Sequence, residues 1–151
     1  MPTHIRKQVR DAAVADLTGL ATTGSNVFTA RVAPLTSAEM PGLVVMLRAE
    51  TSQHDTQSPP TIARDGRLVV EGRAQGGDGL EDTLDQIAVE VETQIYTRAE
   101  ALDLLLMDID PLTTEIVLLE PSEGVAQRTG VIRMLFPVTY RTPLADPTTR
   151  V

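Results

Sequence analysis

Apolar side chains between Leu80 and Tyr96 recur at steps of three and four residues. At about 100° of rotation per residue, this spacing places them in one narrow stripe along a helix. The stripe consists of Leu80, Leu84, Ile87, Val91 and Ile95, and the far side carries Asp82, Asp85, Gln86 and Thr93. The pattern predicts an amphipathic helix with one face in a core and the other open to water or a partner.

A second amphipathic helix is predicted from about Thr3 to Thr18, with Gly19 as its stop. Its apolar side consists of Ile5, Val9, Ala12, Ala13, Leu17 and Leu20. Asp16 falls inside this stripe. We therefore expect either fraying of the helix at Asp16 or a polar neighbour beside it.

Five segments have the composition and alternation of strands: 27–32, 42–48, 67–75, 113–119 and 131–141. The run from Leu43 to Leu47 is wholly apolar, which predicts a central strand covered on both faces. In the third segment, Leu68 and Val70 are predicted to point to one face, and Val69, Glu71 and Arg73 to the other. Pro137 has no N–H to donate, which predicts an edge strand or a bulge.

Other segments lack a strong period. Residues 34–41 predict a connection with at most one helical turn, and residues 97–106 predict a short helical segment that opens with capping-box spacing. Residues 50–64 are polar and contain two prolines, so we predict a loop that is either mobile or a binding loop. The tail, residues 142–151, is predicted to be extended, either frayed or laid on a neighbour.

The predicted order is helix, three strands, helix, short helix and two strands. Short connections favour antiparallel neighbours, and both helix stripes are buried if the two helices pack on one face of one sheet. We therefore predict a single α+β domain over residues 1–151 with an antiparallel or mixed sheet. The other sheet face, with Val69, Val117 and Leu119, is too apolar for water and predicts self-association.

Composition narrows the function further. The chain has 151 residues and no cysteine, which excludes disulfides, thiol catalysis and thiolate metal sites. A net charge of −8 argues against a protein that reads nucleic acid by neutralising phosphates, but not against one that DNA merely passes. Without a secretory signal or an apolar run long enough to span a bilayer, we expect a soluble protein of a reducing compartment.

Candidate chemical sites are few. His4 and His54 are the two histidines, and neither has a carboxylate or a second histidine at ligand spacing. The turn Gly76-Gly-Asp-Gly79 lies between a strand and a helix as phosphate loops do, but it lacks their spacing and Asp78 would repel phosphate. A helix cap formed by Asp78 with Glu81 explains the turn better. We predict no catalytic residue, no cofactor and no metal, and hence no enzyme.

Six stretches spread over most of the chain carry a resemblance to a known family. They are His4 to Ala12, Thr22 to Phe28, Arg31 to Leu35, Met40 to Val44, Leu80 to Ala88 and Val138 to Thr142. On these stretches the chain resembles the tail terminator proteins of long-tailed bacteriophages, the minor tail protein U type. The resemblance implies a small α+β protein with two helices against an antiparallel sheet, in agreement with the predicted order.

The resemblance also implies a structural virion protein. Its copies would form a ring, typically hexameric, that caps the tail tube, stops tube polymerisation and offers a surface for head-tail joining. The implied partners are other copies, the tail tube protein and the head-tail connector or neck protein. Genomic DNA would pass through the ring without specific binding, and no membrane is involved. Such a protein is made in the host bacterial cytoplasm and resides in the tail or neck of the virion.

Two alternatives to a tail terminator stay open. One is another phage neck or tail component, such as a completion or connector protein, and the other is a dimeric α+β ligand-binding domain. For the ring, we predict subunit contacts at Arg48, Val69, Glu71, Arg73, Val89 and Arg133, although strand charges that merely blunt sheet edges would look the same. For the tube, we predict contact through Gln53, His54, Asp55, Thr56 and Gln57, because a loop on a ring can become ordered on docking.

Overall fold

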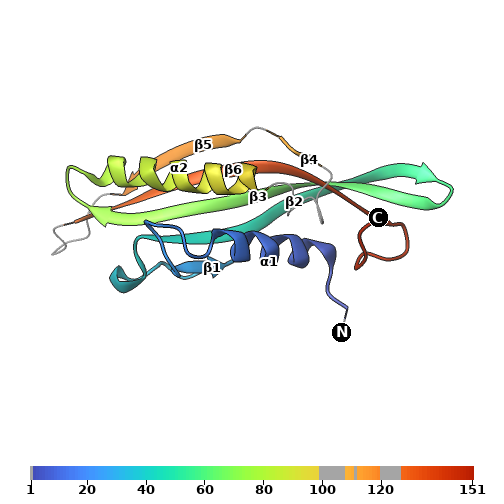
Figure 1. Cartoon of the computed structure of the whole chain (residues 1–151), viewed down its shortest axis with the longest axis horizontal. Helices are drawn as coiled ribbons and strands as arrows, with labels where there is room; N and C mark the ends of the chain where they lie inside the picture. The colour runs from blue at the N-terminus through green and yellow to red at the C-terminus, as the bar shows by residue number, and fades with distance from the viewer. Residues whose placement is uncertain (1, 99–107, 111, 120–126) are drawn as a thin grey trace.

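The computed structural model describes residues 2–98, 108–110, 112–119 and 127–151 (Figure 1). The elements follow in the order α1 (Ile5–Leu17), β1 (Val27–Thr29), the short 3-10 helix η1 (Ser37–Glu39), β2 (Gly42–Gln57), β3 (Pro60–Gly76), α2 (Leu80–Thr97), β4 (Asp108–Ile109), β5 (Thr113–Leu119) and β6 (Arg128–Pro143). Neither described α-helix is long and apolar enough to cross a membrane. The short helical segment predicted over 97–106 lies largely outside the described residues.

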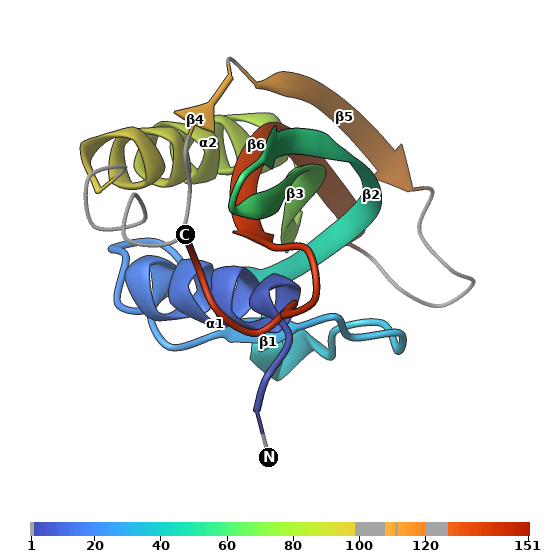
Figure 2. The ribbon, with the colours of Figure 1, turned by 90° about the vertical axis from the view of Figure 1, so that its right-hand side faces the viewer.

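The strands form one mixed sheet of six strands. Its order is β1-β2-β3-β6, and both β4 and β5 pair with the outer side of β6. The pairing of β1 with β2 is parallel, whereas the other pairings are antiparallel. Both helices lie on the same side of this sheet (Figure 2). The predicted α+β class, with two helices on one face, is confirmed.

The main core lies between the two helices and the sheet. The predicted stripe of α2 is fully buried, and α1 buries Ile5, Val9, Ala13 and Leu17. The helix side of β6 contributes Ile132, Met134, Phe136, Val138 and Tyr140. Asp16 does meet a polar neighbour, because its carboxylate lies 3.5 Å from the Arg98 guanidinium. α1 ends as predicted, with Gly19 in the left-handed region at φ +96°.

Two glycines let α2 approach the sheet closely. A Cβ added at Gly72 of β3 would lie 2.7 Å from Ile87 Cγ2, and one at Gly130 of β6 would lie 2.8 Å from Leu84 Cδ1. Real Cβ atoms do not tolerate such distances, so the positions where α2 rests on the sheet require residues without side chains. The bulky apolar side chains of α2 therefore pack directly against the sheet backbone at these two positions.

The other side of the sheet, which we call the open face, is covered over only part of its area. Residues 30–40 fold back across it, and Leu35, Val44, Met46 and Val69 form a second small core there. The prediction that β2 is covered on both faces is thus confirmed. Val69 itself is only 6% exposed, so its predicted place on an uncovered surface is wrong. The chain's own segment covers it, which no local pattern in β3 could indicate.

The predicted loop over residues 50–64 is also wrong. This stretch continues β2 and β3 as one long hairpin, with registered pairs from Gly42–Arg73 to Gln57–Pro60 (Figure 1). β6 pairs with β3 as far as Thr61, so the hairpin is supported by a third strand almost to its end. Residues 51–60 are exposed. Because no apolar side chain was needed on this half of β2, the usual period-2 signal is missing.

Two further predictions need correction. The last strand does not stop at Arg141, and residues 144–151 turn back onto α1, where Ile5 N–H donates to Pro147 O at 2.8 Å.

Of the two alternatives predicted for Pro137, the edge strand is wrong, because β6 is an inner strand. The irregular pairing is the one observed, since Ile109 to Thr113 is four steps and the paired Val138 to Leu135 is three. The Pro137 carbonyl accepts a hydrogen bond from Asp110 N–H, on the side of β6 where its pairing changes from β4 to β5. The N–H that proline lacks would lie on this same side. The hydrogen bonds between β6 and β3 are therefore kept.

We expect Gly72→Ala to lower the free energy of unfolding by about 1–3 kcal/mol, because the new methyl group would push α2 away from the sheet. Urea denaturation followed by circular dichroism measures this. Gly77→Ala is the matched control, since nothing lies within 4 Å of a Cβ at Gly77. Equal stability of the two variants would contradict the close packing of α2.

Candidate interaction surfaces

A groove of about 500 Å³ runs along the open face of the sheet. Its floor comes from β3 and β6, one wall from β5, and the other wall from the segment that follows β1. The lining residues are Val32, Pro34, Leu35, Met40, Glu71, Arg73, Gln75, Val117, Leu119, Thr129, Val131 and Arg133. We call this the open-face groove. Most of its lining is apolar, and a short row of charges crosses its floor.

That row of charges is centred on Glu71, a buried carboxylate. Arg73 donates to one of its oxygens at 2.7 Å and Arg133 to the other at 3.0 Å. Burial raises the pKa of Glu71, but the hydrogen bonds from the two guanidinium groups outweigh it, so the pKa lies below its usual range. Arg133 also lies 3.5 Å from the exposed Glu115. The groove floor is thus a fixed ion-pair network with one positive charge in excess among the lining residues.

The β5 wall leaves apolar side chains in water. Val117 is 38% exposed and Leu119 48% exposed, and both line the groove. No described strand pairs with the outer edge of β5, which therefore presents free backbone groups beside apolar side chains. Soluble proteins usually protect such an edge with charges, prolines or a partner. This part of the sheet is consequently the strongest candidate for a contact surface.

The far end of the β2–β3 hairpin is a second candidate surface, and it is polar. Asp55 forms an ion pair with Arg141 of β6, and the Thr56 hydroxyl donates to Pro59 O at 2.6 Å. These contacts fix the end of the hairpin. The side chains of Gln53, His54 and Gln57 make no hydrogen bond to any described residue, so their polar groups are available to a partner.

At the root of the hairpin, Ala49 forms a bulge in β2. The register shifts between Arg48 and Glu50, and Ala49 has φ +52°. Without the extra residue, Glu50 would share the open face with Met46 and Arg48, since side chains alternate along a strand. The bulge moves Glu50 to the helix side, because such insertions re-aim the side chain that follows.

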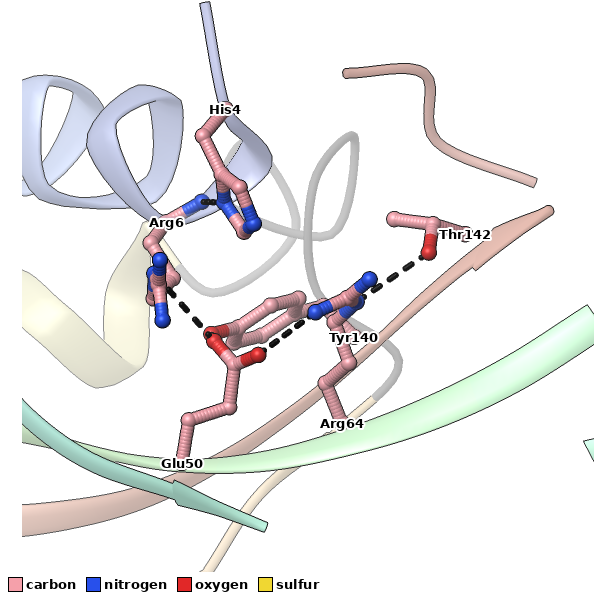
Figure 3. A network of polar contacts seen from close by, with 6 residues as sticks. All are labelled: His4, Arg6, Glu50, Arg64, Tyr140 and Thr142. Carbon is pink, nitrogen blue, oxygen red and sulfur yellow. Dashed lines mark hydrogen bonds and ion pairs between the residues drawn. The ribbon is translucent and has the colours of Figure 1, made fainter. Parts of the chain in front are cut away.

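There Glu50 enters a buried polar network (Figure 3). Arg64 donates to Glu50 Oε1 at 2.6 Å, and the Tyr140 hydroxyl donates to Oε2 at 2.5 Å. Arg6 of α1 lies 3.6 Å away, and Arg64 also donates to Thr142 at 3.1 Å. The Glu50 and Arg64 side chains are only 9% and 10% exposed. The network ties the hairpin root to α1 and β6.

The protonation states in the network support one another. Burial raises the pKa of Glu50, but hydrogen bonds from Tyr140 and Arg64 and the charge of Arg6 bring it below its ordinary value. Burial, followed by the hydrogen bond to Glu50, raises the pKa of Tyr140 far above its ordinary value. Near neutral pH, a carboxylate is therefore held by a neutral phenol and two guanidinium groups.

The outward side of α2 is a third candidate surface. Val89 is 58% exposed there. The residues at helical spacing around it are acidic or polar: Asp82, Asp85, Gln86, Glu92 and Thr93. Glu90, on the flank, is occupied by the Thr22 backbone, whose N–H donates to it at 2.8 Å. An apolar residue in the middle of an acidic face is unlike the rest of the helix surface.

The predicted site residues fall into separate groups. Glu71, Arg73 and Arg133 come together in the groove floor, and Val89 lies on the opposite side of the molecule. Arg48 lies apart on β2, where it donates to Met46 Sδ at 3.2 Å. The Glu50 network was missed, because the bulge that assembles it has no glycine to signal a positive φ. Glu50 stands at the start of a long polar stretch, and nothing else in that stretch indicates that its side chain is buried.

The turn over residues 76–79 is a strand-to-helix junction, but its predicted cap is wrong. α2 begins after Gly79, which has no side chain to cap it, and Asp78 does not take that role. Glu81 and Asp82 in the first turn still complement the helix dipole. Within the described residues, no group of three or more His, Asp or Glu side chains is placed to hold a metal ion.

Comparison with known proteins adds no relative: no protein-family model and no curated protein matches the chain.

We expect Glu50→Gln to lower the free energy of unfolding by about 2–4 kcal/mol at pH 7, because the buried Arg64 guanidinium loses its carboxylate. The pKa of Glu50 is lowered in the folded state, so its contribution is present above its unfolded pKa and is lost as the pH falls. The stability of the wild type should therefore decline more steeply between pH 5 and 3 than that of Glu50→Gln. Guanidinium denaturation at several pH values measures both.

The matched control for that comparison is Glu81→Gln on the exposed first turn of α2. Its effect should stay below about 1 kcal/mol, the size of a helix-dipole contribution. If the free energies of unfolding of the wild type and Glu50→Gln change with pH in parallel, Glu50 is not the anchor of the hairpin root.

Proposed function

We propose that the chain is a structural virion protein of the tail-terminator type. Its copies form a ring, hexameric as in the family it resembles, on the end of a phage tail tube. There the ring stops tube polymerisation and offers the surface to which the head-side connector joins. Its action is surface complementarity repeated around the ring, since many weak contacts held together bind far more tightly than one.

The open-face groove is the observation that carries this proposal. The subunit covers one side of its sheet with two helices, while the other side keeps an apolar groove and a free apolar edge at β5. Uncovered apolar surface of this kind favours association over chemistry. The fold itself also agrees with the small α+β architecture of the resembled family.

The hairpin end is the element we assign to the tube. It extends the sheet past the helices and carries polar side chains that the subunit does not use (Figure 1). The Glu50 network and the third strand hold it in place, so a contact made at Gln53, His54 and Gln57 costs little conformational entropy. A net charge of −8 suits a ring that DNA passes without binding.

The assignment is tested by tail morphology. The tail genes that accompany this chain are expressed with and without it, and the particles are measured by negative-stain electron microscopy. A terminator predicts overlong tubes in its absence. Headless tails of normal length would instead point to a completion or connector protein, and unchanged tails would reject a tail function altogether.

The tube contact is tested by the triple variant Gln53→Ala, His54→Ala, Gln57→Ala. Its free energy of unfolding should stay within about 0.5 kcal/mol of the wild type, because these side chains are exposed and make no hydrogen bond to any described residue. We expect its binding to isolated tube ends, measured by co-sedimentation, to fall at least tenfold. Ser25→Ala, in the turn after α1, is the control, and full binding by the triple variant would remove the hairpin end from the contact.

A further inference from the structure

We propose that the outward side of α2 of one copy docks into the open-face groove of the next copy. The inference rests on the proposed ring, and it names the two surfaces that meet at each subunit contact. Val89 is the apolar anchor on the helix, and the groove between β5 and residues 32–40 receives it. The pairing is an amphipathic helix in a groove, one of the recurrent ways in which proteins recognise one another.

The groove needs a cover of the shape that a helix provides. Its walls expose Val32, Val117 and Leu119, and its floor is formed by the neighbouring strands β3 and β6. A sheet with apolar side chains on both faces is usually covered by helices on both. The subunit supplies helices for one face only, so a helix from a neighbouring copy would complete the three layers.

The helix offers a matching pattern. Val89 stands at the centre of the outward side of α2, and the side chains one turn before and after it are Asp85, Gln86, Glu92 and Thr93. Along the helix Val89 is thus flanked by acidic and polar groups, and on one side it borders a shallow hollow that Leu20 and Ala21 also line. No basic side chain occurs in α2 between Leu80 and Thr97.

The charges of the two surfaces are complementary. The groove floor carries Arg73 and Arg133 against one lining carboxylate, Glu71, in a chain that is otherwise strongly acidic. Arg73 Nε is buried without a hydrogen-bond partner among the described residues. Both side chains of the Arg133–Glu115 ion pair are exposed. Such a pair contributes little free energy, so Arg133 can bind a carboxylate of the neighbouring copy in place of Glu115.

The placement of the two surfaces also fits a ring. α2 rests on Gly72 and Gly130 on the helix side of β3 and β6, and the groove lies on the opposite side of the same two strands. The donor surface and the acceptor surface are therefore back to back in one subunit. A contact between different patches is heterologous, and it closes into a ring when the rotation between copies allows.

A charge exchange tests the contact. Asp85→Arg and Arg133→Glu should each weaken self-association at least tenfold in sedimentation velocity, and the double variant should recover most of the loss. Because Arg133→Glu also disturbs Glu71, Val89→Glu serves as a second single variant at an exposed position. Ala15→Glu adds the same charge to the exposed side of α1 and should have no effect.

A cross-link gives a direct readout. The chain has no cysteine, so Val89→Cys combined with Val117→Cys introduces the two thiols alone. These positions lie on opposite sides of the sheet, and oxidation can join them only between copies. We expect linear and circular multimers on a denaturing gel, both for the free protein and for protein bound to isolated tails.

The outcomes separate this contact from the proposed function. Rings or capped tails without the cross-link, and with no effect of the charge variants, would overturn the contact while leaving the terminator assignment standing. A chain that neither associates nor cross-links in solution or on tails would overturn the contact, and unchanged tails in its absence would overturn the function as well.

Discussion

The close packing of α2 on β3 and β6 is the constraint on which the rest of this structure depends. The helix can bury Leu84 and Ile87 only because Gly72 and Gly130 leave the sheet bare beneath them. This contact fixes which side of both strands becomes the core. The alternation of side chains then places Glu71, Arg73 and Arg133 on the other side, so the groove and its charges follow from the packing of the helix behind them.

The hairpin depends on a second device, a single inserted residue. The bulge at Ala49 reverses which face the following side chains of β2 point to. Before the bulge, β2 buries apolar residues on both faces. After it, β2 carries the buried Glu50 carboxylate and then only exposed polar residues. Glu50 is held by residues from α1, β3 and β6. A polar strand that could slip in register is thereby locked where it leaves the body of the subunit, because a shift of one residue would move Glu50 out of the network.

The packing of α2 and the bulge at Ala49 together create two separate kinds of surface on the molecule. The body offers an apolar groove on one side and an acidic helix on the other, both suited to contact between copies. The hairpin offers polar side chains at a fixed position, suited to a different partner. In the proposed ring, this separation would let one surface change while the other stays intact.

The sequence by itself determined the apolar stripe of α2, most of α1, the cover on both faces of the wholly apolar run in β2, and the limits of β5. It also placed Glu71 and Arg73 on the same face of β3, whereas their meeting with Arg133 of β6 depended on the pairing of the two strands. These features follow from the local order of residues, because a period of 3.6 or 2 residues shows which side chains share a face and an unbroken apolar run indicates a strand covered on both faces. Tertiary structure alone decided the cover over Val69, the hairpin over residues 50–64 and the Glu50 network. Each of these depends on pairing or packing between residues far apart in the chain, and on a bulge at an alanine, where no local pattern reports which strand will be the neighbour.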